Sequence, residues 1–467
     1  MTASARPVLV YGLGRSGLAV VRRLVAGGRP VAFHEQRSSG TDVDEARALG
    51  ATRVAALDDA SASVDYDLCI AAPGVPIDHP DLELLRRAGV EVIGEVEWVW
   101  RTVQGRYLGV TGTAGKGTVT TWLALALTEA GVDAVAGGNI DPALAAVAKP
   151  GATHVVELSS FQLERCPTFR PDVAVTLNLG EDHLDRHRTV AAYHAAKRAI
   201  IANLGPQQTL VSNADDQRLE TWTRSTAATV RRFTLTPTTT PTADAWLDPD
   251  SDTLVLAGEP LISRSELRVT GDHNVANALA VALAATAAGV DRTALVCALR
   301  SFEGLAGRYA VVGRSGGITF IEDSIATRPL AVGAALRSSP RPLVWLAGGK
   351  SKGIDPASLR QTVAERVDLL VAYGECGPDL ARAFADLVPV VRCGQVDGRE
   401  ALDCAVAEAV SFLRERHGGE GTVLLAPLAA SFDQFSDHAH RARVFRDVVS
   451  AIISAAPTDQ SSRQATT

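Results

Sequence analysis

The sequence predicts an α/β protein made of three nucleotide-binding-like units in series. Strand-like apolar runs alternate with Ala- and Leu-rich helical stretches along the whole chain, which is typical of parallel sheets covered by helices. Three of the runs lead directly into glycine-bearing turns, at Gly12, Gly112 and Gly348. The length of 467 residues leaves room for two or three domains.

The expected strands are short and divide the chain into three stretches. In chain order they span residues 8–11, 68–72, 107–110, 155–158, 173–177, 343–347, 369–373 and 423–426. We place domain boundaries near Gly94 and Gly304, which gives domains 1–94, 95–304 and 305–467.

Two stretches of unusual composition lie within the second domain. Residues 235–252 are rich in Thr, Pro and Asp, so we expect a peripheral loop or hairpin there. The Ala-rich residues 274–290 are uncharged but shorter than the roughly 18 residues of a membrane span. We therefore expect a buried helix at 274–290 and no insertion into a membrane.

The composition excludes a disordered or a fibrous protein. Hydrophobic residues make up 46% and charged residues 21%, as in globular proteins, and the net charge of −7 argues against nucleic acid as a partner. The six cysteines form no CxxC pair, so we expect free thiols in a reducing compartment and a cytoplasmic protein without a cleaved signal. They are Cys69, Cys166, Cys297, Cys376, Cys393 and Cys404.

The first glycine loop, Gly12 to Gly17, has the pattern of a diphosphate-binding turn. It follows an expected strand and opens an expected helix, and Glu35 lies eighteen residues beyond Gly17. Glycines allow the backbone to approach a ligand, and the helix N-terminus offers N–H groups to phosphates. The pattern favours a dinucleotide, while another nucleotide diphosphate or a tight turn without ligand stays open.

The second glycine loop, 111–118, joins a strand to a helix expected at 119–130. Its backbone amides are suited to phosphate oxygens, and Lys116 is placed to reach the β and γ phosphates of a nucleotide. The loop departs from GxxxxGK[ST], because Val110 replaces the first glycine and Gly117 replaces the hydroxyl residue. A turn without function is the alternative.

Titratable residues follow two expected strands of the second domain. Glu157 ends one strand, and Glu181, Asp182, His183 and Asp185 follow another. Ligands of parallel sheets gather at the carboxyl ends of strands, so Glu157 and His183 are candidates to hold magnesium against ATP. On spacing alone, a surface carboxylate and a hydrogen-bonded histidine are the favoured interpretation.

Seven motifs in order resemble the Mur ligase family over essentially the whole chain up to about Ser454. They are GVTGTAGKGTVTTW, GGNI, ELSSFQLE, NLGEDHLDRH, YHAAK, GDHNVANALA and DQFSDHAHRARVF. The resemblance implies a Rossmann-like N-terminal domain that binds UDP, a central P-loop-type ATPase domain and a Rossmann-like C-terminal domain that binds an amino acid.

The resemblance also implies a set of site residues. The UDP-substrate set is Gly14, Arg15, Ser16, Gln36, Arg37, Ala72, Pro73, Gly74 and Asn139. The ATP set is Gly112, Thr113, Ala114, Gly115, Lys116, Gly117, Thr118, Asn274, Asn277, Arg308 and Asp323. The glutamate set is Thr327, Lys352 and Ser431. The catalytic set is Lys116, Glu157, His183 and Lys197. Two Mg²⁺ sites are implied, held by Glu157, His183, Thr118 and Lys197 as a carbamate.

Within the family, the chain is most similar to members that join D-glutamate to UDP-N-acetylmuramoyl-L-alanine through an acyl phosphate. This implies a monomer with small-molecule substrates. Five positions depart from the family pattern, namely Ala114, Gly117, Gly307, Ile325 and His438. Alternatives are addition of L-glutamate or another amino acid, including a folylpolyglutamate-synthase-like activity, a non-catalytic nucleotide-binding paralogue, and a nicotinamide-dependent oxidoreductase built on the first glycine loop.

Overall fold

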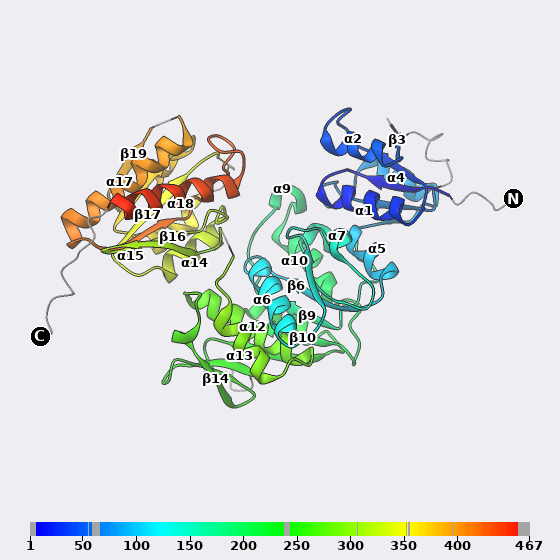
Figure 1. Cartoon of the computed structure of the whole chain (residues 1–467), viewed down its shortest axis with the longest axis horizontal. Helices are drawn as coiled ribbons and strands as arrows, with labels where there is room; N and C mark the ends of the chain where they lie inside the picture. The colour runs from blue at the N-terminus through cyan, green and yellow to red at the C-terminus, as the bar shows by residue number, and fades with distance from the viewer. Residues whose placement is uncertain are drawn as a thin grey trace, which may run out of the picture. The chain divides into compact units, whose positions relative to one another are not determined.

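The computed structural model describes residues 6–54, 56–57, 66–237, 243–305, 307–351, 353, 355–394 and 396–455. The chain divides into two compact units (Figure 1). Unit 1 is Met1–Leu267 with Val275–Phe302, and unit 2 is Arg268–Asn274 with Glu303–Thr467. Each unit is described by itself below.

The first sheet of unit 1 lies within residues 1–94. Its described strands are all parallel, in the order β3-β2-β1-β4-β5. They are β1 (Val8–Tyr11), β2 (Val31–His34), β3 (Thr52–Val54), β4 (Leu68–Ala71) and β5 (Val92–Ile93). The helices nearby in sequence are α1 (Arg15–Ala26), α2 (Thr41–Ala48), α4 (Pro80–Arg87) and α5 (Glu95–Thr102). Every residue of β1 is buried, as its apolar sequence predicts.

The second sheet of unit 1 is larger, with the described order β14-β13-β12-β11-β10-β9-β6-β8-β7. Its strands are β6 (Arg106–Thr111), β7 (Ala134–Gly138), β8 (Thr153–Glu157), β9 (Val173–Thr176), β10 (Thr209–Asn213), β11 (Thr229–Thr234), β12 (Ala245–Asp248), β13 (Thr253–Leu256) and β14 (Glu259–Ser263). The central strands β9, β6 and β8 are parallel neighbours, so their carboxyl ends meet at one edge.

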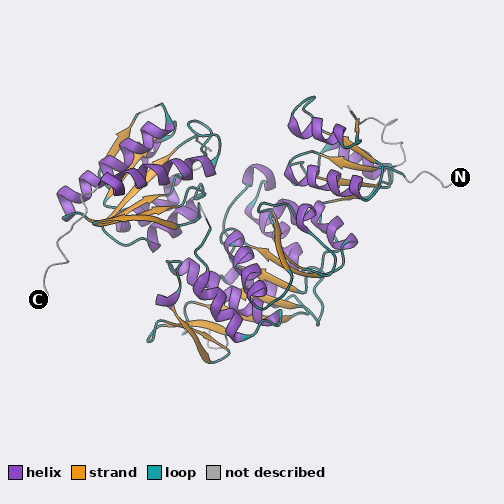
Figure 2. Ribbon diagram, in the orientation of Figure 1, coloured by secondary structure: helices purple, strands orange, loops and turns teal. Residues whose placement is uncertain are grey.

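Helices cover this second sheet (Figure 2). They are α6 (Lys116–Glu129), α7 (Leu144–Val147), α8 (Ser160–Leu163), α9 (Leu184–His187), α10 (Val190–Arg198), α11 (Gln217–Thr223), α12 (Asp272–Ala287) and α13 (Arg292–Ser301), with 3-10 turns η1 (Ala199–Ile201) and η2 (Arg264–Glu266). The hairpin expected in 235–252 is confirmed by the antiparallel pair β12 and β13, while 238–242 lie outside the described residues.

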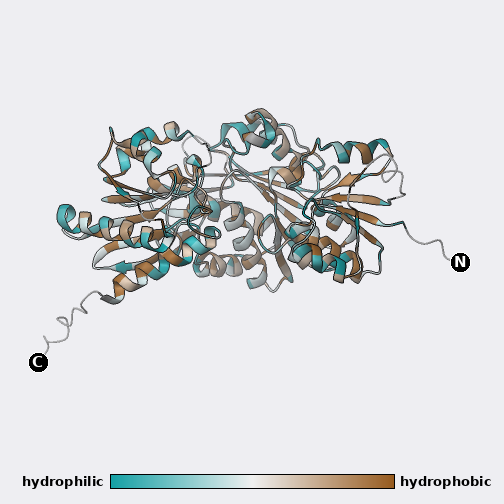
Figure 3. Ribbon diagram, turned by 90° about the horizontal axis from the view of Figure 1, so that it is seen from above, coloured by the Kyte–Doolittle hydropathy of each residue, from teal (hydrophilic) through white to brown (hydrophobic). Residues whose placement is uncertain are grey.

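The buried helix expected at 274–290 is confirmed by α12. Its residues Val275 and Ala278–Ala285 are at most 4% exposed. No helix among the described residues has the length and apolar character to cross a membrane. In Figure 3, which is coloured by hydropathy, the strands are mostly hydrophobic, whereas the helices carry both hydrophobic and hydrophilic residues.

Unit 2 contains a sheet with the described order β15-β16-β20-β17-β18-β19, in which β15 alone is antiparallel. Its strands are β15 (Ala310–Ser315), β16 (Gly317–Glu322), β17 (Leu343–Gly348), β18 (Leu369–Tyr373), β19 (Val390–Cys393) and β20 (Glu420–Leu425). Its helices are α14 (Pro329–Ser338), α15 (Arg360–Arg366), α16 (Gly377–Phe384), α17 (Gly398–His417) and α18 (His438–Ala455), with the turn η3 (Pro356–Leu359).

Alternate side chains of β17 enter two separate cores of unit 2. Trp345 packs with residues of α14, α15 and α16, whereas Val344 packs with residues of α17 and α18. Both are fully buried, so this sheet is covered on both faces, as the run of apolar residues predicts. One sheet thus lies in each of the ranges 1–94, 95–304 and 305–467, and the boundaries themselves stay predictions.

The expectation that all six cysteines are free is wrong for two of them. Cys393 and Cys404 form a disulfide, with their Cα atoms 6.1 Å apart. The end of β19 and the first turns of α17 bring them together, and this is a tertiary contact that their spacing does not reveal. Cysteine usage therefore gives no independent argument for a reducing compartment. The remaining four are free.

Candidate active site

The first glycine loop forms a close turn between β1 and α1. Gly12 has a φ of +90°, and a Cβ on Gly17 would lie 1.9 Å from the Gly12 oxygen. Only glycine fits at position 17 for this reason. Helix α1 begins after Gly14 without a side-chain cap, so its first N–H groups are suited to an anion.

Glu35 braces this loop. Its Oε2 accepts a hydrogen bond from the Leu13 N–H at 3.0 Å, and its Oε1 accepts from Arg37 Nε at 3.2 Å. Burial alone would raise the pKa of Glu35, but these hydrogen bonds hold it below its usual value. The carboxylate that suggested a dinucleotide site is thus engaged by Leu13 and Arg37.

Several members of the predicted UDP-substrate set are linked to the second sheet. Arg15 donates to the Asn139 oxygen at 2.6 Å, and Asn139 Nδ2 donates to Glu157 Oε1 at 2.6 Å. Ser16 hydrogen-bonds Glu95, which also accepts from the Ala145 N–H. Burial raises the pKa of Glu95, although both hydrogen bonds oppose this rise. The structure thus connects the start of α1 with the end of β8.

The second glycine loop is held by a residue that the sequence analysis missed, Asn178. Its Oδ1 accepts from the Thr113 and Ala114 N–H groups at 3.1 and 2.8 Å, and its Nδ2 donates to the Ala114 oxygen at 3.1 Å. Gly115 has a φ of +84°, and a Cβ there would lie 2.6 Å from Asn277 Oδ1. Asn277 therefore lies directly against the loop, at the N-terminus of α6.

Two lysines converge on the same backbone oxygen. Lys116 Nζ and Lys197 Nζ donate to the Gly112 oxygen at 3.0 and 2.8 Å. Lys197 is 1% exposed and lies 4.9 Å from the Tyr193 ring centre. Burial, reinforced by the charge of Lys116, lowers the pKa of Lys197 well below its usual value, although Asp182 and Glu157 oppose the shift.

Glu157 is placed to hold a cation. It ends β8 and is 2% exposed, and its Oε2 is buried without a hydrogen-bond partner in the described part of the chain. A buried carboxylate oxygen left in this way is costly unless it meets a positive group. The other oxygen accepts from Asn139, so Oε2 is the oxygen that could meet a cation.

His183 directly precedes α9 and has a left-handed backbone conformation, with a φ of 53°. Its Nε2 lies 3.4 Å from Asp182 Oδ2, and its ring centre lies 4.7 Å from that of Phe161. Thr118, in the first turn of α6, is 7% exposed. Among the described residues, no group of three or more His, Cys, Asp and Glu side chains is arranged to hold a metal.

Unit 2 carries the predicted residues Arg308 and Asp323 close together. Burial, together with the charge of Glu322, raises the pKa of Asp323 to about 7 against the opposing charge of Arg308. The neighbouring Glu322 is fully buried and accepts from the Gly307 and Ser324 N–H groups at 2.9 and 2.8 Å. Gly307 has a φ of +82°, in the left-handed region that favours glycine.

Of the predicted glutamate set, Thr327 and Ser431 lie on loops at the carboxyl edge of the unit 2 sheet. Arg441, fully buried and missed by the sequence analysis, donates to the oxygens of Ser324, Ala429 and Ala430. It thereby joins the loop before Thr327 to the one before Ser431, which is 3% exposed. The third member of the set, Lys352, lies outside the described residues. Asn274, a member of the predicted ATP set, donates to the Thr270 oxygen at 2.9 Å.

Replacing Asp323 with asparagine is expected to stabilise the protein at pH 8 more than at pH 4. A pKa of about 7 instead of 3.8 means that the folded state keeps a proton that the unfolded state loses. Stability therefore falls as pH rises from 4 to 7, by up to about 4 kcal/mol, and stays lowered above pH 7. Melting temperatures of both proteins across this range measure the effect, and a constant difference would contradict it.

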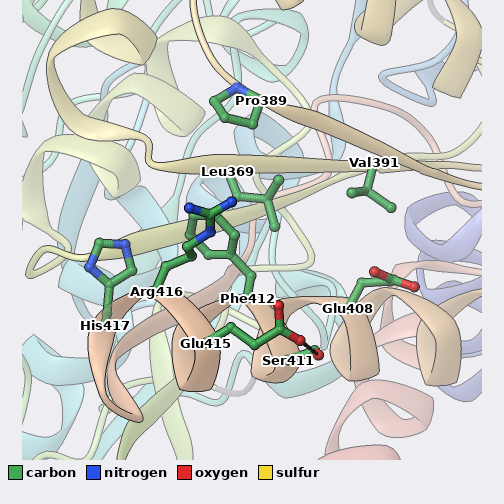
Figure 4. A pocket seen from close by; sticks show the side chains of 9 residues that line it. All are labelled: Leu369, Pro389, Val391, Glu408, Ser411, Phe412, Glu415, Arg416 and His417. Carbon is green, nitrogen blue, oxygen red and sulfur yellow. Dashed lines mark hydrogen bonds between the residues drawn. The ribbon is translucent and has the colours of Figure 1, made fainter.

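A groove of about 700 Å³ lies elsewhere on unit 2 (Figure 4). It is lined by Leu369, Pro389, Val391, Glu408, Ser411, Phe412, Glu415, Arg416 and His417. Leu369 is the first residue of β18, so the groove lies at the amino end of this strand. Ligands of parallel sheets gather at the opposite edge, where Gly348 ends β17. None of the described site residues lines the groove.

Solved structures with the same fold are ligases. The UDP-N-acetylmuramate-alanine ligase of Thermotoga maritima aligns with a TM-score of 0.59 at 19% identity, covering 96% of this chain and 99% of that one. A pseudomurein peptide ligase type C of Methanothermus fervidus aligns with a TM-score of 0.60 at 17% identity, covering 96% and 100%. These likenesses confirm the predicted α/β fold with three domains.

Relatives in sequence are more informative. Residues 6–94 match the model of the Mur ligase MurD-like, N-terminal domain, and residues 110–285 match the Mur ligase middle domain. Proteins named UDP-N-acetylmuramoylalanine--D-glutamate ligase are similar in Thermus thermophilus, at 42% identity over 95% of this chain and 97% of the relative, and in Deinococcus radiodurans, at 43% over 96% and 92%. The chain therefore belongs to the Mur ligase family.

Proposed function

We propose that the protein is an ATP-dependent ligase that joins D-glutamate to UDP-N-acetylmuramoyl-L-alanine, a step of peptidoglycan precursor synthesis. The observation that carries the proposal is the convergence of Lys116 and Lys197 on the phosphate loop beside the buried Glu157. The relatives from Thermus thermophilus and Deinococcus radiodurans, whose names state this activity, support the same substrates.

Each predicted domain takes one ligand in this proposal. Residues 1–94 bind the UDP moiety on the first glycine loop, with Gln36, Arg37 and the turn from Ala72 to Gly74 around the uracil. Residues 95–304 bind ATP on the second glycine loop. Residues 305–467 bind glutamate through Thr327, Lys352 and Ser431, because hydroxyl and ammonium groups donate hydrogen bonds to carboxylates.

Magnesium fits the residues near the phosphate loop. Glu157 Oε2 is a buried oxygen without a hydrogen-bond partner among the described residues, and oxygen is the ligand that Mg²⁺ prefers. Glu157, His183, Thr118 and the carbamylated Lys197 would hold two ions. When bound, magnesium would neutralise charge on the phosphate oxygens of ATP.

A carbamate on Lys197 is chemically suited to this position. The buried lysine contacts the Gly112 oxygen and lies near Glu157, where a neutral amine is favoured over an ammonium group. A neutral amine can attack carbon dioxide, and loss of a proton leaves a carbamate anion. This anion would supply oxygen ligands where an ammonium group would repel the metal.

The reaction proceeds in two steps. The substrate carboxylate attacks the γ-phosphorus of ATP, the bond to ADP breaks, and an acyl phosphate forms. The glutamate amine then attacks the acyl carbon, phosphate leaves with the bonding electrons, and the amine loses a proton to give the amide. Lys116 and the first N–H groups of α6 stabilise negative charge on the transferred phosphoryl group.

The test is phosphate release by the wild-type protein with ATP, Mg²⁺, bicarbonate and UDP-N-acetylmuramoyl-L-alanine, across a panel of D- and L-amino acids. We expect release only when the nucleotide acceptor is present, and fastest release with D-glutamate. Fastest release with L-glutamate would replace D-glutamate as the proposed amino acid. The identity of the amino acid is the part of the proposal on which the departure at Ile325 bears most. No release with any amino acid would overturn the proposal.

A further inference from the structure

We propose that Arg186 is a positioning residue for the UDP-substrate. It holds the turn from Ala72 to Val75, which we call the uracil turn because the proposed function places Ala72 to Gly74 around the uracil. Its guanidinium donates to the Val75 oxygen at 2.9 Å, and more distantly to the Gly74 and Pro73 oxygens at 3.4 and 3.5 Å. A single planar group thus contacts three successive carbonyls of the turn. The inference rests on the proposed function, since it concerns the site given there to UDP.

The Arg186 guanidinium is itself held in place by Glu164 and Phe161. It donates to Glu164 Oε2 at 3.0 Å and lies 4.8 Å from the centre of the Phe161 ring. Glu164 Oε1 lies 3.3 Å from His187 Nδ1, and His187 hydrogen-bonds Ser160 Oγ at 2.9 Å. With a side chain only 13% exposed, Arg186 has little freedom to leave the turn.

A second arginine, Arg165, reaches the same turn from the end of α8. It is 2% exposed and donates to the Val75 oxygen at 2.6 Å. Burial, followed by the charge of Arg186, lowers the pKa of Arg165 to about 10. Two cations on one short turn repel each other, so this arrangement costs free energy that a looser loop would avoid. The cost is consistent with a turn whose shape matters for a ligand.

Arg186 also connects the turn to the catalytic residues. It lies on α9, which begins directly after His183, and Phe161 contacts both Arg186 and the His183 ring. A turn held by Arg186 therefore keeps a constant position relative to the segment that carries His183. By holding the uracil end of the nucleotide substrate, this contact fixes where the reacting L-alanyl carboxylate at the other end lies relative to His183.

The test compares Arg186→Ala with the wild-type protein. We expect the Kd for UDP-N-acetylmuramoyl-L-alanine, measured by calorimetry without ATP, to rise about tenfold or more, which corresponds to about 1.4 kcal/mol. The KM for this substrate should rise in parallel, whereas the KM for ATP should change by less than about twofold. Arg186→Lys should recover only part of the binding, because an ammonium group does not span three carbonyls.

Arg188→Ala is the matched control. Arg188 lies two residues further on and reaches the same region, but its side chain is 80% exposed and pairs with Asp78 Oδ2 at 3.0 Å. Its removal should change the Kd by less than about twofold, because exposed ion pairs contribute little. If Arg186→Ala does not fold, Arg186→Lys and Glu164→Gln take its place, with the Kd expected to rise in both.

The outcomes separate the two proposals. Wild-type protein that neither binds the UDP-substrate nor releases phosphate would overturn the proposed function. Wild-type protein that does both, with an unchanged Kd in folded Arg186 variants, would overturn only the positioning role. A Kd that rises equally in Arg186→Ala and Arg188→Ala would also overturn it, because the effect would then follow from charge on the segment in general.

Discussion

Lys197→Ala is expected to lose nearly all ligase activity, about a thousandfold or more in kcat, and to regain part of it with added formate or acetate. The side chain is 1% exposed and lies among Gly112, Glu157 and Asp182. In the proposed mechanism, its removal takes away the carbamate oxygens and leaves a space beside the phosphate loop. A short carboxylate is small enough to enter that space and restore an oxygen ligand. Phosphate release at increasing formate concentration measures the rescue.

Lys149→Ala controls for the general loss of a lysine in the same unit. Lys149 pairs with Asp133 at 2.6 Å, and half of its side chain is exposed, so its removal should leave kcat unchanged within about twofold. Near-wild-type activity in Lys197→Ala would contradict the role of Lys197. A large loss without any rescue would contradict the carbamate specifically, and would leave Lys197 as a packing residue beneath the loop.

Glu157→Gln is expected to lower kcat by about a hundredfold to a thousandfold and to raise the Mg²⁺ concentration needed for half-maximal activity. The amide has the shape of the carboxylate, so Asn139 still finds a carbonyl oxygen as its acceptor. The atom that replaces Oε2 is then the NH2 group, which does not bind Mg²⁺. Titration of activity with Mg²⁺ separates loss of metal affinity from loss of chemistry.

Glu181→Gln is the matched control for Glu157→Gln. Glu181 lies in the exposed part of the loop before His183, so neutralising it should leave the Mg²⁺ titration within about twofold of the wild type. An unchanged Mg²⁺ requirement in Glu157→Gln would contradict a metal-binding role. A melting temperature raised in Glu157→Gln would be consistent with the cost of the unpaired buried oxygen in the metal-free protein.

The local elements of this protein are readable from single stretches of sequence. The strand at 8–11 matches β1 residue for residue, and the strand at 369–373 matches β18. A short, fully buried strand must be apolar throughout, and glycine must follow where the chain turns tightly into a helix. Both signals are local. The helix expected at 119–130 begins three residues earlier, at Lys116, because Gly115 in a left-handed conformation starts it.

Residues that hold the site together were not readable in the same way. Asn178, Arg165, Arg186 and Arg441 donate to or accept from backbone groups that lie 11 to 117 residues away along the chain. An arginine that donates to distant carbonyls has no local pattern that distinguishes it from an exposed arginine. The same applies to Cys393 and Cys404, whose pairing depends on where α17 begins.

The sequence by itself determined the order of strands and helices, the two phosphate-type glycine loops and the family, because each depends on residues that are neighbours in the chain. Only the tertiary structure decided which charges are buried and what they touch. In the sequence, Glu35 supported a dinucleotide site, whereas in the fold it accepts hydrogen bonds from Leu13 and Arg37. On spacing alone Glu157 was expected to be a surface carboxylate, and this is wrong, because it is buried and its Oε2 has no hydrogen-bond partner among the described residues. Burial and partnership are set by packing between distant elements, and the free energy of a charge depends on both.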